Sequence, residues 1–187
     1  TKDHIEKPSK FTPRQRLWYI RAKEVIISTG SIERPLVFGN NDRPGIMLAS
    51  AAKEYMRVYG VLVGKKPIIF TNNDSGYETA IDFKKNGIDP LIVDVRKNPD
   101  SSIVNEARNL GINIKFSHGV VNAKGHLKVK SATIGKLNTE KNDYENLEDI
   151  SCDCICVSGN WTPTVHLSSQ SGNKLKFDDQ INAFIPN

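Results

Sequence analysis

The sequence has few of the features that mark membrane, disulfide-stabilised or nucleic-acid-binding proteins. No apolar run approaches the ~18 residues of a membrane-spanning helix, and the start of the chain lacks the apolar core of a signal peptide. It also lacks an initiator methionine, which indicates a processed chain or a piece of a longer one. The net charge of +5 is spread along the chain, without clusters of basic and aromatic residues. We therefore expect neither a membrane nor a nucleic acid as a partner.

Cysteine is scarce, and the three that occur do not suit a metal site or a disulfide. Cys152, Cys154 and Cys156 are spaced by two residues, which on a strand turns all three side chains to one face. Zinc sites favour wider spacing, and sulfurs this close on one strand do not readily form an unstrained disulfide. We expect buried reduced thiols and no metal ligands. No nucleophile and base form a motif either, so we expect no catalytic residue.

The clearest pattern that the sequence does contain is a βαβ unit over residues 67–96. Residues 67–71 form a short apolar run without polar alternation, which is typical of a parallel strand covered on both faces. Residues 75–86 follow a helical period. Residues 91–93 form the next buried strand, which Asp94 closes. This unit predicts an α/β fold with a Rossmann-like parallel sheet.

The turn inside this unit resembles a dinucleotide-binding turn that has lost its function. In such turns, glycines let the backbone and a helix N-terminus approach a pyrophosphate, and an acid about 20 residues later holds the ribose. Gly76 matches the last glycine and Asp94 matches the acid, but Thr71 and Asn73 stand where the first two glycines belong. Side chains there, with Asp74 beside them, obstruct or repel an anion. We expect the fold to survive without the ligand site, with Gly76 serving helix packing in preference to phosphate contact.

The other segments extend the sheet and add an antiparallel ribbon. The expected helices cover residues 46–59, 103–110 and 163–170. The expected strands cover residues 16–21, 25–27, 112–116, 118–121, 127–136, 152–157, 174–178 and 182–186. We expect the strand at 25–27 to be buried and the polar, acidic residues 138–149 to form an exposed connection.

Two strands end in small-residue turns that allow a bulky group to approach the backbone. The first ends in Ser-Thr-Gly at Gly30, and the second in Ser-Gly at Gly159. This repetition suggests that one domain is interrupted and another is inserted. We predict that residues 1–45 belong to a first dinucleotide-binding domain, residues 46–150 to an inserted Rossmann-like domain, and residues 151–187 to the return into the first.

Several longer strings closely resemble one family, the alpha subunits of heterotetrameric sarcosine oxidase. They are GSIERPLVF from Gly30, NNDRPGIMLASA from Asn40, TNNDSGYETA from Thr71, VDVR from Val93 and SGNWTPTVHLSSQSG from Ser158. Alpha subunits of related amino-acid dehydrogenases and proteins like the pyridine nucleotide-disulfide oxidoreductases share parts of this pattern. The resemblance covers nearly all of residues 17–186.

The resemblance implies an interior piece of a subunit, with an intact glycine fingerprint upstream and a folate-binding region downstream. The implied reaction is the oxidative demethylation of sarcosine to glycine by a cytoplasmic complex of alpha, beta, gamma and delta subunits. NAD is implied in the alpha subunit, and FAD and FMN in the beta subunit. We expect this fragment to be inactive alone and to bind none of them.

The resemblance also assigns candidate cofactor-binding residues. Thr29 and Gly30, with Ser158, Gly159 and Trp161, match the two strand-end motifs that would line the NAD site. The remaining two candidates, Gly76 and Asp94, match the inserted domain.

Two other interpretations stay open at this stage. The chain could be an autonomous NAD(P)-dependent reductase domain, with Arg96 after Asp94 suggesting a 2′-phosphate. It could also be a purely structural domain that contacts a partner subunit. If it is a fragment, the strands that end at Gly30 and Gly159 lack their parent sheet, which predicts exposed apolar surface and self-association.

Overall fold

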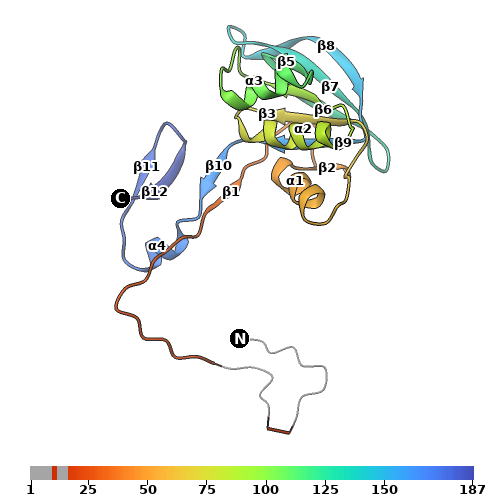
Figure 1. Cartoon of the computed structure of the whole chain (residues 1–187). Coiled ribbons are helices and arrows are strands. Elements are labelled where there is room, and N and C mark those ends of the chain that lie inside the picture. Colours follow the sequence, from red (N-terminus) through yellow and green to blue (C-terminus); the bar gives the residue numbers. More distant parts are fainter. Residues whose placement is uncertain (1–9, 12–16) are drawn as a thin grey trace.

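The computed structural model describes residues 10–11 and 17–187, and it places a layered α/β unit beside a narrow arm (Figure 1). The layers are a set of helices, a five-stranded parallel sheet and a three-stranded antiparallel sheet. The arm carries the carboxyl terminus and the first long stretch of the described chain. This architecture confirms the predicted α/β class with a parallel sheet, βαβ units and an antiparallel ribbon.

The parallel sheet is built around two strands from distant parts of the chain. Its order is β2 (Ile46–Leu48), β9 (Cys154–Ser158), β3 (Pro67–Thr71), β4 (Leu91–Asp94) and β5 (Asn113–Phe116). Strands β3 and β9 are buried along their whole length, which explains their uninterrupted apolar sequences. Three helices cover one face: α1 (Ala49–Arg57), α2 (Ser75–Lys85) and α3 (Ser102–Asn109). None of the helices in the described part of the chain is long and apolar enough to cross a membrane.

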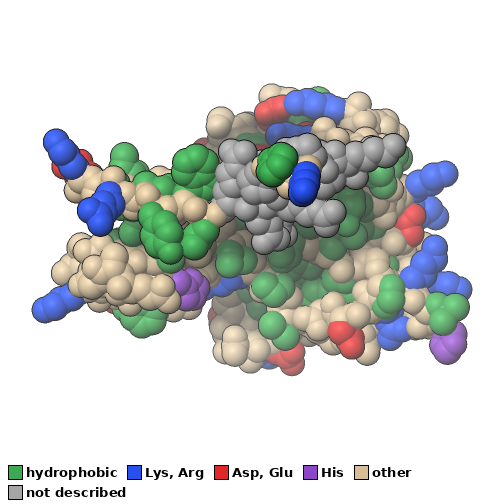
Figure 2. All heavy atoms as spheres, turned by 90° about the horizontal axis from the view of Figure 1, so that it is seen from below, with side chains coloured by type: hydrophobic (Ala, Val, Ile, Leu, Met, Phe, Trp, Pro, Cys, Tyr) green, Lys and Arg blue, Asp and Glu red, His purple; other side chains and the backbone are tan. Residues whose placement is uncertain are grey.

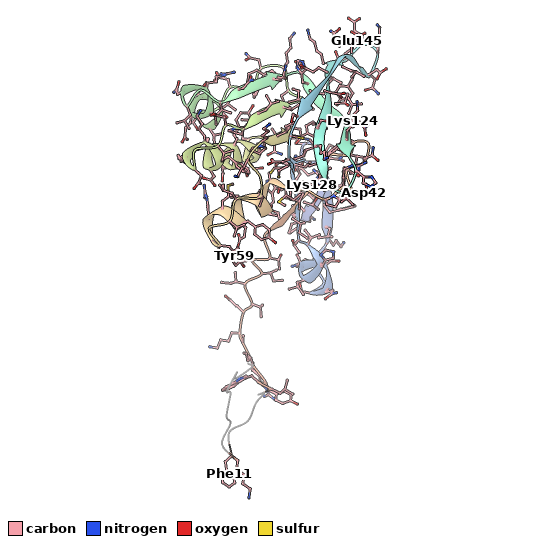
Figure 3. All side chains as sticks on the ribbon, turned by 90° about the vertical axis from the view of Figure 1, so that its right-hand side faces the viewer. Phe11, Asp42, Tyr59, Lys124, Lys128 and Glu145 are labelled. Atoms are coloured by element: carbon pink, nitrogen blue, oxygen red, sulfur yellow. The ribbon has the colours of Figure 1, made fainter. Side chains whose placement is uncertain are left out.

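The antiparallel sheet covers the opposite face of the parallel sheet. It contains β6 (His118–Gly125), β7 (Val129–Asn138) and β8 (Asp143–Ser151), in that order. Its buried side chains, such as Val120 and Ile134, pack against Phe70 and Val157 of the parallel sheet. Figure 3 shows Lys124 and Glu145 on this layer, on the far side from the helices, and Tyr59 just after α1.

The core consists of two apolar clusters, one on each side of the parallel sheet. Cys154 and Cys156 lie under the helices with their sulfurs 3.6 Å apart, whereas Cys152 precedes β9 and joins the other cluster. The three thiols are buried and unbridged, as predicted, but the expectation of a single shared face is wrong for Cys152. Burial and the nearby Cys154 and Asp153 raise the pKa of Cys152 to about 12, so its thiol stays protonated near neutral pH.

The arm contains two chain segments that run side by side, a short helix and a hairpin. A two-stranded linker, residues 29–35 and 159–164, connects it to the layered unit; within the linker, strands β1 (Ser31–Glu33) and β10 (Trp161–Pro163) pair antiparallel. Beyond them lie α4 (His166–Gln170) and the hairpin of β11 (Leu175–Asp178) and β12 (Ala183–Pro186). Figure 2 shows hydrophobic side chains on the surface of this arm. Its most exposed large apolar side chains include Val25 at 78% and Ile26 at 90%.

The sequence predicted exposed apolar surface at the strands that end at Gly30 and at Gly159, and the structure bears this out at one of the two. Residues 25–27 are exposed and form no strand, so the prediction of a buried strand is wrong, while the prediction of exposed apolar surface there is confirmed. Strand β9, which ends just before Gly159, is fully buried in the parallel sheet, so the prediction of exposed surface is wrong at that position. The difference follows from pairing, because β9 has partners on both sides and residues 25–27 have none.

The parallel sheet begins at residue 46, as the predicted domain limit requires, but it crosses the predicted limit at residue 150. Strand β9 lies between β2 and β3, so the sheet includes residues 154–158 as well as residues 46–116. The arm, by contrast, takes its parts from both ends of the chain. The assignment of residues 1–45 and 151–187 to a first dinucleotide-binding domain stays a prediction.

Candidate functional site

The candidate site is the turn that joins β3 to α2 at the carboxyl edge of the parallel sheet. Parallel α/β sheets bind ligands at this edge. Here the turn is filled by its own side chains. Thr71 Oγ1 donates to the carbonyl of Asn73 at 2.8 Å, and the carboxamide oxygen of Asn73 accepts the backbone N–H of Ser75 at 2.8 Å. The Asn73 oxygen therefore takes the helix N-terminal N–H that a phosphate oxygen uses in a dinucleotide-binding turn.

Strand β9 and the linker close the same turn from the other side. The carboxamide nitrogen of Asn73 donates to the carbonyl of Ser158 at 3.1 Å. Ser158 Oγ lies 3.0 Å from Ser75 Oγ, and Trp161 Nε1 donates to Ser75 Oγ at 3.0 Å. Two predicted site residues, Ser158 and Trp161, thus meet the turn after β3 through Ser75.

Gly76 is required here by the close approach of α2 to β3. A Cβ atom at this position would lie 2.8 Å from both Cβ and Oγ1 of Thr71, closer than real Cβ contacts allow. Because Thr71 is fully buried, it has little room to move away. This geometry favours the packing role that the sequence indicated for Gly76.

Replacing Gly76 with alanine is expected to destabilise the fold by about 1–2 kcal/mol, because overpacking costs roughly 1–3 kcal/mol and the better helix propensity of alanine returns up to about 1 kcal/mol. Urea unfolding followed by circular dichroism measures the difference. Lys85→Ala, at an exposed position of the same helix, serves as the control and should change stability by less than about 0.5 kcal/mol. A Gly76→Ala chain as stable as the unaltered one would contradict the packing role.

Asp94, the predicted ribose-binding acid, is fully buried and engaged within the protein. Its carboxylate accepts the Tyr77 hydroxyl at 2.7 Å, the Arg96 backbone N–H at 2.9 Å and the Arg96 guanidinium at 2.8 Å. Arg96 also donates to Asp74 at 2.7 Å, and its guanidinium lies 5.8 Å from the centre of the Tyr77 ring. Asp94 is thus surrounded by donors from its own chain, and Arg96 stands between it and Asp74.

The electrostatics of this network favour its charged, bonded form. Burial would lower the pKa of Arg96, but the hydrogen bonds and charges of Asp94 and Asp74 outweigh burial and raise that pKa. Burial and the hydrogen bond to Asp94 raise the pKa of Tyr77, so its hydroxyl remains a donor. Burial opposes ionisation of Asp74 also, but Arg96 holds the pKa of that carboxyl below its usual value. Arg96 therefore has two carboxylate partners already.

Gly159 lies where the two linker segments pair closely, next to β1 and β10. Its N–H donates to the Arg34 carbonyl at 2.7 Å, and the Arg34 N–H donates to the Asn160 carbonyl at 2.8 Å. A Cβ atom at Gly159 would lie 2.7 Å from the Arg34 carbonyl oxygen and 2.9 Å from that of Pro35. Nearby, the buried Glu33 carboxylate accepts the Ser50 N–H at the start of α1, at 2.8 Å. The bonds of Gly159 and Arg34 thus hold the two linker segments together, and the bond from Ser50 to Glu33 attaches the linker to the layered unit.

Thr29 and Gly30 lie farther along the linker, in the arm. Thr29 Oγ1 donates to the Thr164 carbonyl, and the Gly30 carbonyl accepts the Thr164 N–H at 2.9 Å. Gly30 has a positive φ of 66°, so this turn does need glycine, as its sequence indicated. Both residues are exposed.

The predicted site residues therefore fall into two groups. Gly76, Ser158 and Trp161 meet at the turn after β3, and Asp94 ends the neighbouring strand β4. Thr29 and Gly30 bond to Thr164 of the other linker segment, and Gly159 lies between the two groups. Sequence reasoning missed Ser75 and Tyr77 as parts of the site. Their signal was their place in the first turn of a helix that follows a parallel strand.

Metal chemistry has no support in the described residues. No group of three or more His, Cys, Asp or Glu side chains in residues 10–11 and 17–187 could hold a metal ion. The arrangement at the turn positions backbone and side chains without offering a nucleophile paired with a base.

The layered unit, its two-stranded linker and its dinucleotide-type turn define a fold of the thioredoxin reductase class. Thioredoxin reductase from T. acidophilum superposes with a TM-score of 0.62 at 15% identity, covering 83% of this chain and 54% of that one. At this identity the likeness shows the fold alone.

The sequence comparisons are more specific. No family model matches the chain. The sarcosine oxidase alpha subunits of Corynebacterium sp. strain P-1 and Rhizobium meliloti strain 1021 are 38% and 34% identical to it, over 98% and 97% of its length. The chain is therefore homologous, along almost all of its length, to a segment of the sarcosine oxidase alpha subunit. It spans 19% and 17% of the length of these two relatives.

Proposed function

We propose that this chain is the part of a sarcosine oxidase alpha subunit that supports the NAD-binding region without binding a dinucleotide at its own turn. In this role it contributes to the oxidative demethylation of sarcosine to glycine by a multi-subunit flavin and NAD oxidoreductase. The homology over 98% of the chain supports the assignment to the subunit. The segment itself is a scaffold and performs no chemical step.

The observation that carries this proposal is the self-filled turn after β3. The Asn73 carboxamide accepts from Ser75 at the helix N-terminus, where an intact dinucleotide-binding turn leaves N–H groups for a pyrophosphate. The ribose-binding position is also taken, because Asp94 is fully buried beneath Arg96 and Tyr77. A dinucleotide would have to displace both sets of bonds.

The proposal places NAD in the first dinucleotide-binding domain, to which residues 1–45 and 151–187 would contribute. Thr29 and Gly30, with Ser158, Gly159 and Trp161, are the proposed lining residues. The exposed linker around Thr29 and Gly30 leaves room for a large ligand beside the backbone. FAD and FMN would lie in the beta subunit, and the partners would be the beta, gamma and delta subunits. When bound, NAD supplies a redox-active nicotinamide, and this chain only orients it.

Calorimetric titration of the chain with NAD and NADP tests the proposal. We expect no saturable binding at micromolar concentrations, because the turn after β3 is filled by its own side chains. An intact NAD-dependent dehydrogenase in the same buffer serves as the positive control. Micromolar binding of either dinucleotide would overturn the proposal and favour an autonomous NAD(P)-dependent reductase domain, with Arg96 released from Asp74 to meet a 2′-phosphate.

A further inference from the structure

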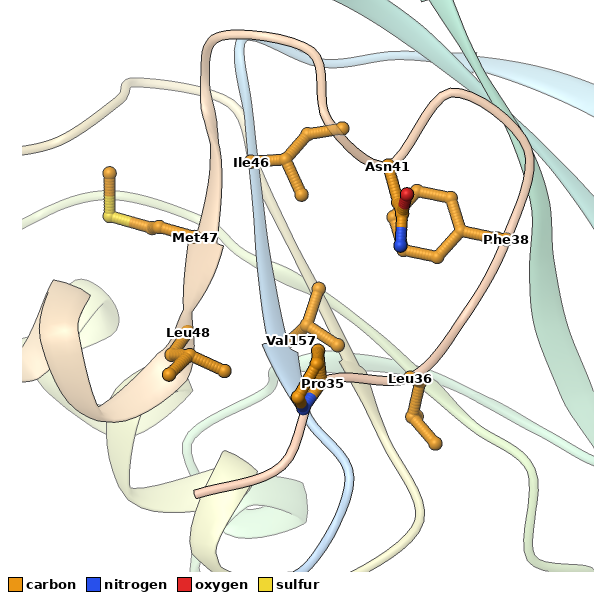
Figure 4. A pocket seen from close by; sticks show the side chains of 8 residues that line it. All are labelled: Pro35, Leu36, Phe38, Asn41, Ile46, Met47, Leu48 and Val157. Atoms are coloured by element: carbon orange, nitrogen blue, oxygen red, sulfur yellow. The ribbon is translucent and has the colours of Figure 1, made fainter. Parts of the chain in front are cut away.

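An apolar cavity, open to solvent on one side, lies at the β2 edge of the parallel sheet (Figure 4). Its volume is about 220 Å³. Its lining residues come from β2, from β9 and from the segment between β1 and β2: Pro35, Leu36, Phe38, Asn41, Ile46, Met47, Leu48 and Val157.

The cavity arises because the two sheets have different numbers of strands. The antiparallel sheet packs over the middle of the five-stranded sheet, where β7 meets β9 and β6 meets β4. Residues 35–41 form the cover near the edge strand β2, and Gly39 bridges to Asn122 of β6. An irregular segment fills space less completely than a strand with regular side-chain alternation. A gap therefore remains above Ile46 and Val157.

The lining selects for a neutral, mostly apolar group. Asn41 is the only lining residue with a polar side chain, and it is exposed, so its carboxamide lies at the open side of the cavity. Figure 4 shows Asn41 and Phe38 on the segment between β1 and β2, among the residues that line the cavity. Ligand sites are typically apolar pockets with a few polar groups that fix orientation. No charged side chain lines the cavity, so nothing there offsets the desolvation of an ion.

The volume sets the size of the ligand. An apolar cavity of about 150 Å³ is enough to bind benzene. The cavity here, at about 220 Å³, accommodates one or two fused rings. We propose that it binds a small neutral aromatic molecule, whose rings lie against Ile46 and Val157 and whose single polar atom bonds to Asn41. This proposal is independent of the function proposed for the turn after β3.

Indole is the probe, because it has two fused rings and one N–H donor. Methyl resonances of the isotopically labelled 187-residue chain are followed by NMR during titration. We expect saturable shifts at Ile46, Leu48 and Val157. Leu36→Trp, which fills the cavity from its wall, should weaken binding by about tenfold or more, because it occupies the buried contact area. Asn41→Ala should weaken it by about fivefold, the loss of one modest hydrogen bond.

Val37→Trp is the matched control, because Val37 lies in the same segment but is 87% exposed and does not line the cavity. Its indole affinity should stay within about twofold of the unaltered chain. Adenine, of similar size but more polar, should bind at least about tenfold more weakly than indole. Absence of saturable shifts up to the solubility of indole, an equal loss in both tryptophan variants, or equal binding of adenine would each overturn the proposal.

Discussion

Replacing Arg96 with methionine is expected to destabilise the chain by about 3 kcal/mol, which is the low end of the cost of breaking a buried ion pair. Asp94 is fully buried, and the variant leaves its charge without the guanidinium that lies 2.8 Å away. The cost stays at the low end because the Tyr77 hydroxyl and the backbone N–H of residue 96 still bond to the carboxylate. Chemical denaturation monitored by circular dichroism gives the difference in unfolding free energy.

A double variant separates the buried charge from the packing of the side chain. Asp94→Asn with Arg96→Met removes both charges and should recover part of the loss, since no uncompensated ion remains. Lys124→Ala breaks an exposed pair with Asp149 and should cost at most about 1 kcal/mol. If Arg96→Met costs no more than Lys124→Ala, then Arg96 does not compensate Asp94 in the way described.

Replacing Gly159 with alanine is expected to cost about 2–3 kcal/mol through overpacking. The added Cβ would lie 2.7 Å from the Arg34 carbonyl oxygen, which belongs to the backbone of the opposite linker segment. Backbone atoms cannot turn away as a side chain can, so the two segments must separate. The bonds between Gly159 and Arg34 and between Arg34 and Asn160 would lengthen or break. Thermal unfolding and hydrogen exchange of the Arg34 and Gly159 amides report both effects.

Gly87→Ala is the control for Gly159→Ala. Gly87 has a positive φ of 76° and no neighbouring atom within 4 Å of an added Cβ, so only backbone strain opposes the substitution. That strain amounts to about 1 kcal/mol. Amide exchange at Arg34 should remain unchanged in this variant. If amide exchange at Arg34 is also unchanged in Gly159→Ala, the two linker segments are not packed closely at Gly159.

The sequence predicts the βαβ unit well because its signals are local. The predicted strand at 67–71 and helix at 75–86 correspond to β3 (Pro67–Thr71) and α2 (Ser75–Lys85). The strand predicted at 91–93 is β4 (Leu91–Asp94). A buried parallel strand followed by a helical period needs no knowledge of distant partners.

The errors occur where distant partners decide the structure. Residues 46–48 were predicted to start a helix but form β2, because they pair with β9 more than a hundred positions later in the chain. Residues 138–149 are largely exposed, as predicted, but the prediction of a connection is wrong, since residues 143–149 belong to β8 (Asp143–Ser151). That strand lies at a sheet edge with both faces largely exposed, so its polar sequence carries no apolar alternation.

The sequence predicted the position of the candidate site and its obstructed turn, but not the hydrogen bonds that its side chains make. Missing glycines at Thr71 and Asn73 indicate an obstructed turn from the sequence alone. The bonds from Trp161 to Ser75 and from Tyr77 to Asp94 depend on how the linker and the helix approach the turn. Such bonds leave no periodic signal, because each joins residues whose spacing is set by the whole fold.

The Asn73 carboxamide at the start of α2 affects how the folding of this segment depends on small molecules in the cell. Proteins that fold around a cofactor gain stability with the logarithm of its concentration, and the unfolded fraction that is degraded rises when the cofactor is scarce. A segment that supplies the equivalent contacts from its own chain folds without waiting for a small molecule. The folding of this segment should therefore be insensitive to the concentration of dinucleotides.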